Sequence, residues 1–228
     1  MFETLDNHPI PKALPDHVGI IPDGGRRWAS QHHCTLPESY LVTRRLLRDM
    51  AALLFSRGVK EITVYLSSIQ NFRRDHNEIS AYIEAIGKSM HTEIARLVKS
   101  NNLKIVFAGN REILPTPLKE AIVKMEQRTE KNAGGRLNLL LAYDPYEEVL
   151  QAIANSHSYD LFYRYLQVTT PVDLIIRPGG TQLLSNFLPL QSGFARLFFS
   201  DKLFNDFTLE DLQNVLDDFA GLDRRFGN

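Results

Sequence analysis

The chain has 228 residues, of which 43% are hydrophobic and 23% charged, and its formal net charge is -1. That charge excludes a global positive field, so we expect no nucleic-acid partner and only a local anion site. No stretch approaches 18 apolar residues, which predicts no membrane span, and the single cysteine together with a polar first 16 residues predicts a cytoplasmic protein. We expect one domain over residues 1–228.

The first predicted element is a strand at residues 17–22, where β-branched apolar residues stand together. Residues 23–28 (DGGRRW) follow it directly. Ligands bind outside the carboxyl ends of strands in open α/β sheets, and glycines let backbone N–H groups approach an anion. Asp23 could hold a divalent cation on that anion, and the arginines could pair with its oxygens. The stretch predicts a diphosphate–magnesium site; the alternative is a turn followed by solvated arginines.

Helical and strand patterns alternate along the rest of the chain. Residues 29–39 show no pattern, and residues 67–75 are predicted to be a polar loop. Residues 77–99 carry one apolar stripe of a long helix, which either packs in the core or lines an apolar pocket. The other predicted helices are 40–56, 116–131, 145–155 and 209–219, and the other strands are 59–66, 103–108, 136–143, 172–176 and 196–199, with 156–170 ambiguous.

This alternation predicts an α/β fold with a central, mostly parallel six-stranded sheet flanked by helices. Four blocks of the chain, in order, then resemble the cis-prenyltransferase family, whose best-known member is undecaprenyl diphosphate synthase. They are residues 23–28, 67–74 (SSIQNFRR), 177–191 (RPGGTQLLSNFLPLQ) and the tail 224–227 (RRFG). The resemblance covers nearly the whole chain and implies prenyl diphosphate substrates, Mg²⁺ and a homodimer.

The resemblance also implies roles for the matching residues. Asp23 acts with magnesium on an allylic diphosphate, and Ser68 and Asn71 serve the reacting centre. The tail residues Arg225 and Gly227 match a motif near the phosphates and the dimer interface. The complete set that the resemblance assigns to substrate binding is Gly24, Gly25, Arg26, Arg27, Trp28, Arg74, Arg177, Ser185, Arg196, Arg225 and Gly227.

The chain departs from the family pattern mainly around the second substrate. The family's magnesium-binding glutamate is Arg196 here, and its second arginine after the fifth strand is Leu183. We therefore expect Arg177, Ser185 and Arg196 to hold the second diphosphate without a metal ion. The other departures are Leu36 and Tyr40 for an arginine and a histidine, Thr181 for a glutamate, and residues 142–145 (AYDP) for Asn-Tyr-Gly-Gly.

These departures resemble the irregular branch of the family, the lavandulyl- and cyclolavandulyl-type diphosphate synthases. The resemblance implies a prenyltransferase that condenses two dimethylallyl diphosphates head to middle and releases diphosphate. Whether the product cyclises stays open. The alternatives are a regular short-chain enzyme that adds isopentenyl diphosphate, a diphosphate-eliminating terpene synthase, and a catalytically silent partner subunit, which would be expected to lack Asp23.

The expected homodimer has a candidate surface in the sequence. Residues 197–199 (LFF) and 203–204 (LF) are apolar, which favours a two-fold contact between copies. The alternative is that these residues belong to the core.

Overall fold

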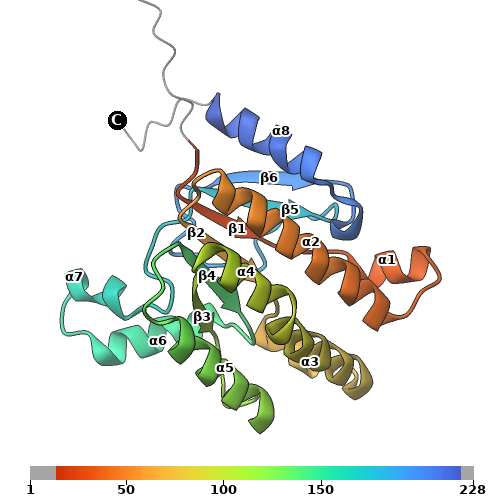
Figure 1. The fold of residues 1–228 in the computed structure, drawn as a ribbon. Helices are drawn as coiled ribbons and strands as arrows, with labels where there is room; N and C mark the ends of the chain where they lie inside the picture. The colour runs from red at the N-terminus through yellow and green to blue at the C-terminus, as the bar shows by residue number, and fades with distance from the viewer. Residues whose placement is uncertain (1–13, 222–228) are drawn as a thin grey trace, which may run out of the picture.

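The computed structural model describes residues 14–221, except for the side chains of residues 159 and 160. Its centre is a six-stranded sheet in the order β3-β4-β2-β1-β5-β6, and every neighbouring pair of strands is parallel (Figure 1). The predicted fold class is therefore confirmed. The strands are β1 (His17–Ile20), β2 (Glu61–Tyr65), β3 (Lys104–Ala108), β4 (Arg136–Leu140), β5 (Leu174–Pro178) and β6 (Arg196–Ser200).

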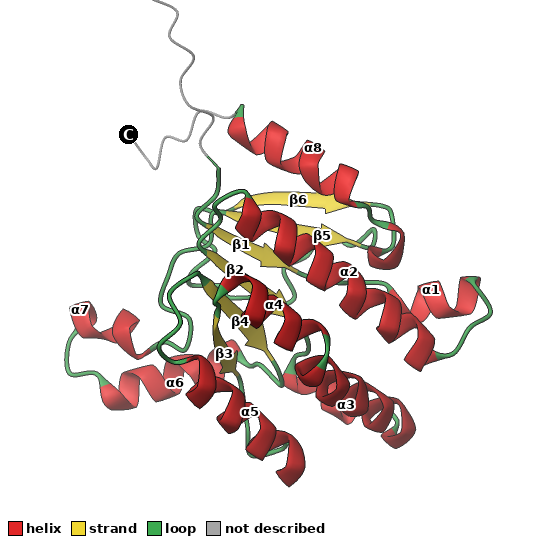
Figure 2. Cartoon of the chain, in the orientation of Figure 1, coloured by secondary structure: helices red, strands yellow, loops and turns green. Residues whose placement is uncertain are grey.

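Helices flank the sheet, as Figure 2 shows. The larger apolar cluster joins the sheet to α2, α3, α4, α5 and α8, and a smaller cluster on Ile175 and Leu140 packs against the segment around Phe187. The helices are α1 (Gly25–Gln31), α2 (Leu36–Ser56), α3 (His76–His91), α4 (Glu93–Asn101), α5 (Thr116–Thr129), α6 (Pro145–Asn155), α7 (Tyr159–Phe162) and α8 (Leu209–Ala220). Short 3₁₀ helices are η1 (Ile69–Arg73), η2 (Tyr163–Tyr165) and η3 (Phe204–Asp206).

The prediction of irregular structure at residues 29–39 is wrong. Helix α1 occupies residues 25–31, and α2 begins at Leu36, four residues before the predicted start. Thr35 caps α2: its hydroxyl accepts the Glu38 N–H, and the Glu38 carboxylate accepts the Thr35 N–H. Such a capping box fixes a helix start even where apolar periodicity is weak.

The single helix predicted over residues 77–99 is two helices, α3 and α4. The chain breaks at Thr92, whose φ of -119° and ψ of -88° are not helical. The Thr92 hydroxyl donates to the Lys88 carbonyl at 2.8 Å and also to the Glu93 carboxylate. Side-chain bonds of this kind compete with helical continuation, which apolar periodicity alone does not register.

The other predicted elements are found with shifted ends. Strand β1 ends at Ile20 and β4 at Leu140, each earlier than predicted, while β5 runs on to Pro178. The predicted polar loop contains η1, and the ambiguous segment contains α7 and η2. Within residues 14–221 no helix is long and apolar enough to span a membrane.

Part of the expected dimer surface is core. Leu203 is 8% exposed and Phe204 is fully buried, so the prediction that they meet a second copy is wrong. Phe204 packs in the main apolar cluster together with Phe207 and α8. Leu197 on β6 remains 41% exposed.

Candidate active site

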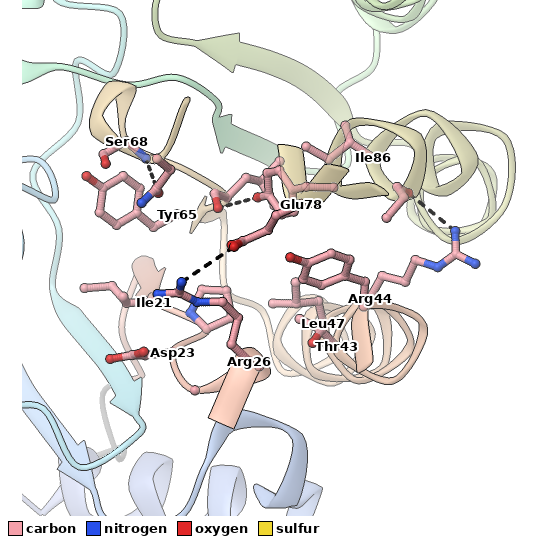
Figure 3. Close-up of a pocket in the computed structure, with 18 of the residues that line it drawn as sticks. Ile21, Asp23, Arg26, Thr43, Arg44, Leu47, Tyr65, Ser68, Glu78 and Ile86 are labelled. Carbon is pink, nitrogen blue, oxygen red and sulfur yellow. Dashed lines mark hydrogen bonds and ion pairs between the residues drawn. The ribbon is translucent and has the colours of Figure 1, made fainter. Parts of the chain in front are cut away.

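A pocket of about 670 Å³ opens at the carboxyl ends of β1, β2 and β5. One side of the pocket is polar and carries Asp23, Arg177 and the glycines after β1. The other side lies between α2 and α3, as Figure 3 shows, and includes the apolar side chains of Leu47 and Ile86. Parallel strands bring all their carboxyl ends to one edge, which explains why segments far apart in sequence meet here.

Asp23 and Arg177 form an ion pair in the polar part of the pocket. Arg177 is 6% exposed, and its Nη2 donates to Asp23 Oδ2 at 2.9 Å. Its Nη1 donates to Ser185 Oγ at 2.8 Å and to the Leu183 carbonyl. Burial alone would raise the pKa of Asp23, but the Arg177 hydrogen bond and the charges of Arg177 and Arg27 outweigh it and lower that pKa. The carboxylate is therefore ionised at neutral pH.

Two glycines give the site its tight backbone. Gly24 has φ of +101° and precedes α1, and a Cβ there would lie 2.8 Å from Leu203 Cδ2. Gly179 has φ of +123°, and its Cβ would lie 2.9 Å from the Asp23 Cβ. Both positions therefore require glycine, because it adopts a positive φ without strain and has no Cβ to clash with these neighbours. The N–H groups of the first turn of α1, those of Gly25 to Arg27, have no intrahelical carbonyl to bind.

Exposed arginines surround the mouth of the pocket. Arg27 Nη2 lies 3.2 Å from Asp23 Oδ1, and Arg26 Nη1 lies 3.6 Å from Glu78 Oε2. Arg74 Nη1 donates to Glu78 Oε1 at 3.0 Å. With Arg177, these residues place four guanidinium groups around two carboxylates, an arrangement that can accept a further anion.

Residues after β2 line the pocket beside these arginines. The Ser68 N–H donates to Asn71 Oδ1 at 3.0 Å, which orients the Asn71 amide so that its NH₂ group is available to a ligand. Ser68, Asn71 and Arg74 all line the pocket, and Ser185 faces them from the loop after β5. The Tyr65 hydroxyl donates to the Ser185 carbonyl at 2.9 Å and so connects the two loops. Burial raises the pKa of Tyr65 to about 12, which keeps it a hydrogen-bond donor.

The apolar part of the pocket is lined by α2 and α3. The rings of Tyr40 and Tyr82 meet edge to face with centroids 5.4 Å apart, and the Tyr82 hydroxyl donates to the Leu66 carbonyl. Leu47, Ile79, Ala85 and Ile86 complete this part. Lining a pocket and packing in the core were the two interpretations of the stripe at 77–99, and residues of α3 do both.

Several residues expected at the site lie elsewhere. Trp28 does not line the pocket; its Nε1 donates to Asp206 at 2.7 Å and its ring stacks on His32. Arg196 begins β6 and is paired in register with Leu174, whereas the pocket lies at the other end of these strands, about 13 Å away for four residues of strand. The expectation that Arg196 joins Arg177 and Ser185 is therefore wrong within one chain. Arg225 and Gly227 lie outside the described residues.

The residues of the pocket could hold a magnesium ion only if a bound phosphate-containing substrate supplied further ligands. Among residues 14–221 no group of three or more His, Cys, Asp or Glu residues could hold a metal. Asp23 offers one ionised carboxylate with a side chain that is 28% exposed, beside several cations that favour phosphate. Magnesium is commonly held by one or two carboxylates, water and substrate phosphates. Asp23 is thus the protein ligand that such an ion would use.

Sequence reasoning missed the pocket wall on α2 and the carboxylate that α3 contributes. Glu78 is a second carboxylate of the site, and Tyr40 appeared only as a departure from a family pattern. The available signal was helical spacing: Tyr40, Thr43, Arg44 and Leu47 lie on one face of α2. Thr43 and Arg44 are polar residues on this otherwise apolar face, and their presence indicates that the face lines a pocket and is not fully buried in the core.

Comparisons with known proteins identify a family and relatives that match most of the chain. The model of the family described as "Putative undecaprenyl diphosphate synthase" matches residues 21–227. An isoprenyl transferase from Lactococcus lactis is 31% identical over 242 residues, covering 100% of this chain and 99% of that protein. A tritrans,polycis-undecaprenyl-diphosphate synthase (geranylgeranyl-diphosphate specific) from Pyrococcus horikoshii is 29% identical over 94% of this chain and 87% of that protein.

A solved structure is also similar along nearly the whole chain. It is lavandulyl diphosphate synthase from Lavandula x intermedia in complex with dimethylallyl diphosphate. It has a TM-score of 0.88 and 27% sequence identity, and the match covers 94% of this chain and 99% of that one.

Proposed function

Because the chain belongs to the cis-prenyltransferase family of the undecaprenyl diphosphate synthases and is a prenyl-transferring enzyme, we propose that it joins two dimethylallyl diphosphates head to middle. The product would be an irregular monoterpene diphosphate of the lavandulyl type. The observation that carries this proposal is that Leu183 stands where the family pattern has a second arginine after β5. Leu183 is 63% exposed and offers Arg177 only its main-chain carbonyl, which supports a second diphosphate that is bound without a cation at this position.

The likeness to lavandulyl diphosphate synthase supports the same conclusion. In the proposed reaction the C1–O bond of one dimethylallyl unit breaks, and its diphosphate leaves with the bonding electrons. The C2=C3 double bond of the second unit attacks through C2, which forms the new bond to C1 and leaves a tertiary cation at C3. Loss of a proton, to the departed diphosphate or another base, completes the product.

This chain's residues would serve each stage. Asp23 would hold Mg²⁺, which supplies positive charge to the leaving diphosphate when bound. The first turn of α1 and Arg27 would bind the same diphosphate, and such electrostatic stabilisation is commonly the largest contribution to catalysis. Ser68 and Asn71 would position the reacting carbons, while the Tyr40 and Tyr82 rings would keep water from the cation.

We also propose that the enzyme is a homodimer. Strand β6 is an edge of the sheet, and Phe194 beside it is 72% exposed. Exposed edges and apolar side chains of this kind are usually covered. If two β6 strands pair antiparallel about a two-fold axis, Arg196 of one copy comes to the carboxyl end of β6 in the other, near the pocket. Arg196 could then bind the second diphosphate across the interface.

A second candidate is a regular short-chain enzyme that adds isopentenyl diphosphate to an allylic diphosphate. It is favoured by the names of the relatives, which include isoprenyl transferases from Lactococcus lactis and Treponema denticola. The retained Asp23 and Asn71 suit either reaction.

Incubation with labelled dimethylallyl diphosphate and Mg²⁺, with and without isopentenyl diphosphate, tests the proposal. We expect dimethylallyl diphosphate alone to give a ten-carbon product whose NMR spectrum shows a C1-to-C2 linkage, and Asp23→Asn to remove it. Formation of product only when isopentenyl diphosphate is present, with a C1-to-C4 linkage, would refute the head-to-middle reaction.

A further inference from the structure

The apolar part of the pocket ends at a charged residue. Arg44 lines the pocket from α2, one turn before Leu47, and in Figure 3 it lies on the side opposite Asp23. Its Nε lies 3.7 Å from Glu93 Oε2, and its Nη1 donates to the Ala85 carbonyl at 3.4 Å. The guanidinium therefore joins α2 to α3 and α4 across the end of the pocket.

Burial keeps this guanidinium in place. Glu93 is only 6% exposed, and the Thr92 hydroxyl also donates to its carboxylate. A carboxylate buried to this extent requires a neighbouring cation, so Arg44 cannot turn away without a large cost in free energy. Arg44 Nε is itself buried and makes no hydrogen bond within residues 14–221.

Arg44 also separates two cavities. A groove of about 240 Å³ lies on its other side, lined by Pro37, Glu38, Leu41, Arg44, Ala81, Glu84, Ala85 and Lys88. Arg44 and Ala85 are the residues that line both this groove and the main pocket. Shortening the Arg44 side chain would join the two spaces into one longer channel between α2 and α3.

We propose that Arg44, held by Glu93, is a specificity-determining residue that limits the length of the hydrocarbon tail in the pocket. On this proposal a tail of five carbons lies between the diphosphate site and Arg44, whereas a tail of fifteen carbons would extend into the groove on the far side of Arg44. Contact with the guanidinium gives hydrocarbon no favourable partner, while it would hinder hydration of the charge. This inference rests on the proposed function, because it takes the occupant to be the tail of an allylic diphosphate.

Binding of unreactive substrate analogues tests the inference without relying on turnover. The probes are the thiolodiphosphates of dimethylallyl and farnesyl alcohols, with Mg²⁺, measured by calorimetry on the full chain. We expect the wild-type protein to bind the five-carbon probe about tenfold or more tightly than the fifteen-carbon probe, because a closed pocket rejects a longer tail. Arg44→Ala should tighten fifteen-carbon binding by about tenfold or more and change five-carbon binding by less than about threefold.

Two further variants control for the unpaired charge that Arg44→Ala leaves on Glu93 and for changes confined to the outer groove. Arg44→Ala leaves Glu93 without its cation, so the double variant Arg44→Ala/Glu93→Ala removes both charges and should show the same change in preference. Lys88→Ala alters only the outer groove and should leave the preference as in the wild type. Circular dichroism and thermal unfolding would establish that each variant is folded.

The outcomes separate this inference from the proposed function. Equal binding of both probes by the wild type, or an unchanged preference in the folded Arg44→Ala and Arg44→Ala/Glu93→Ala variants, would overturn the role of Arg44 and leave the proposed function untouched. Failure of both probes to bind the wild type would overturn both this inference and the proposed site. The linkage in the product, measured separately, bears on the head-to-middle reaction and not on Arg44.

Discussion

Replacing Asp23 separates its expected catalytic role from its structural one. Asp23 accepts a hydrogen bond from the buried Arg177 at 2.9 Å and lies 3.2 Å from Arg27. Asp23→Ala removes the carboxylate, whereas Asp23→Asn keeps an oxygen that can still accept from Arg177. Both variants lose the negative charge that a metal ion would require, so turnover should fall by about 10³-fold in each, equivalent to about 4 kcal/mol of barrier.

The two variants should differ in stability. Removing one partner of a buried ion pair costs roughly 3–5 kcal/mol, but Asp23 is 28% exposed and Arg177 keeps its bonds to Ser185 and Leu183. We therefore expect Asp23→Ala to lose about 2 kcal/mol and Asp23→Asn about 1 kcal/mol. For a chain of this size these losses correspond to falls in Tm of about 4–8 °C and about 2–4 °C.

The assays are release of diphosphate from dimethylallyl diphosphate with Mg²⁺ and thermal unfolding followed by circular dichroism. A matched control is Glu112→Gln, since the Glu112 side chain is 91% exposed and its ion pair with Lys119 is long, at 3.5 Å. The control should resemble the wild type in both assays. If Asp23→Asn kept more than a tenth of the activity, the role of this carboxylate in diphosphate departure would be refuted.

Four further predictions rest on the same geometry. Because the pKa of Asp23 is lowered in the folded state, its ionised carboxylate stabilises that state at pH values above the ordinary aspartate pKa of about 4, and this stabilisation is lost as the pH falls through the lowered pKa. The difference in unfolding free energy between the wild type and Asp23→Asn, measured by urea unfolding, should therefore become smaller from pH 7 to about pH 2. Gly179→Ala, which puts a Cβ 2.9 Å from the Asp23 Cβ at φ of +123°, should lower kcat/KM by about tenfold and stability by about 1–3 kcal/mol, whereas Gly193→Ala, with nothing within 4 Å, should do neither. Arg196→Ala should raise the KM for the acceptor by about tenfold, and Phe194→Asp should give monomers in sedimentation; a monomeric, fully active wild type would contradict both.

Patterns in the sequence were enough to predict the fold class and most of the polar site. Short apolar runs such as residues 17–22 alternate with helical patterns, and parallel strands place everything that follows them at one edge of the sheet. Strand direction alone predicted a site at Asp23 after β1, and the resemblance to the family added Ser68 after β2 and Arg177 at the end of β5. Strand direction could also have excluded Arg196 from the pocket of its own chain, because that residue begins a strand and so lies at the opposite edge of the sheet.

Contacts between distant segments account for the features that local patterns leave open. The ion pair between Asp23 and Arg177 joins residues 154 positions apart, and no periodicity encodes its geometry. The break at Thr92 depends on side-chain hydrogen bonds that apolar spacing does not register. The end of the pocket depends on how α2 crosses α3, since Arg44 has the sequence context of a solvated helix residue and becomes a wall only because Glu93 and Ala85 are brought against it. Periodicity fixes which face of a helix is apolar, but packing between helices fixes which polar residue is buried and what it touches.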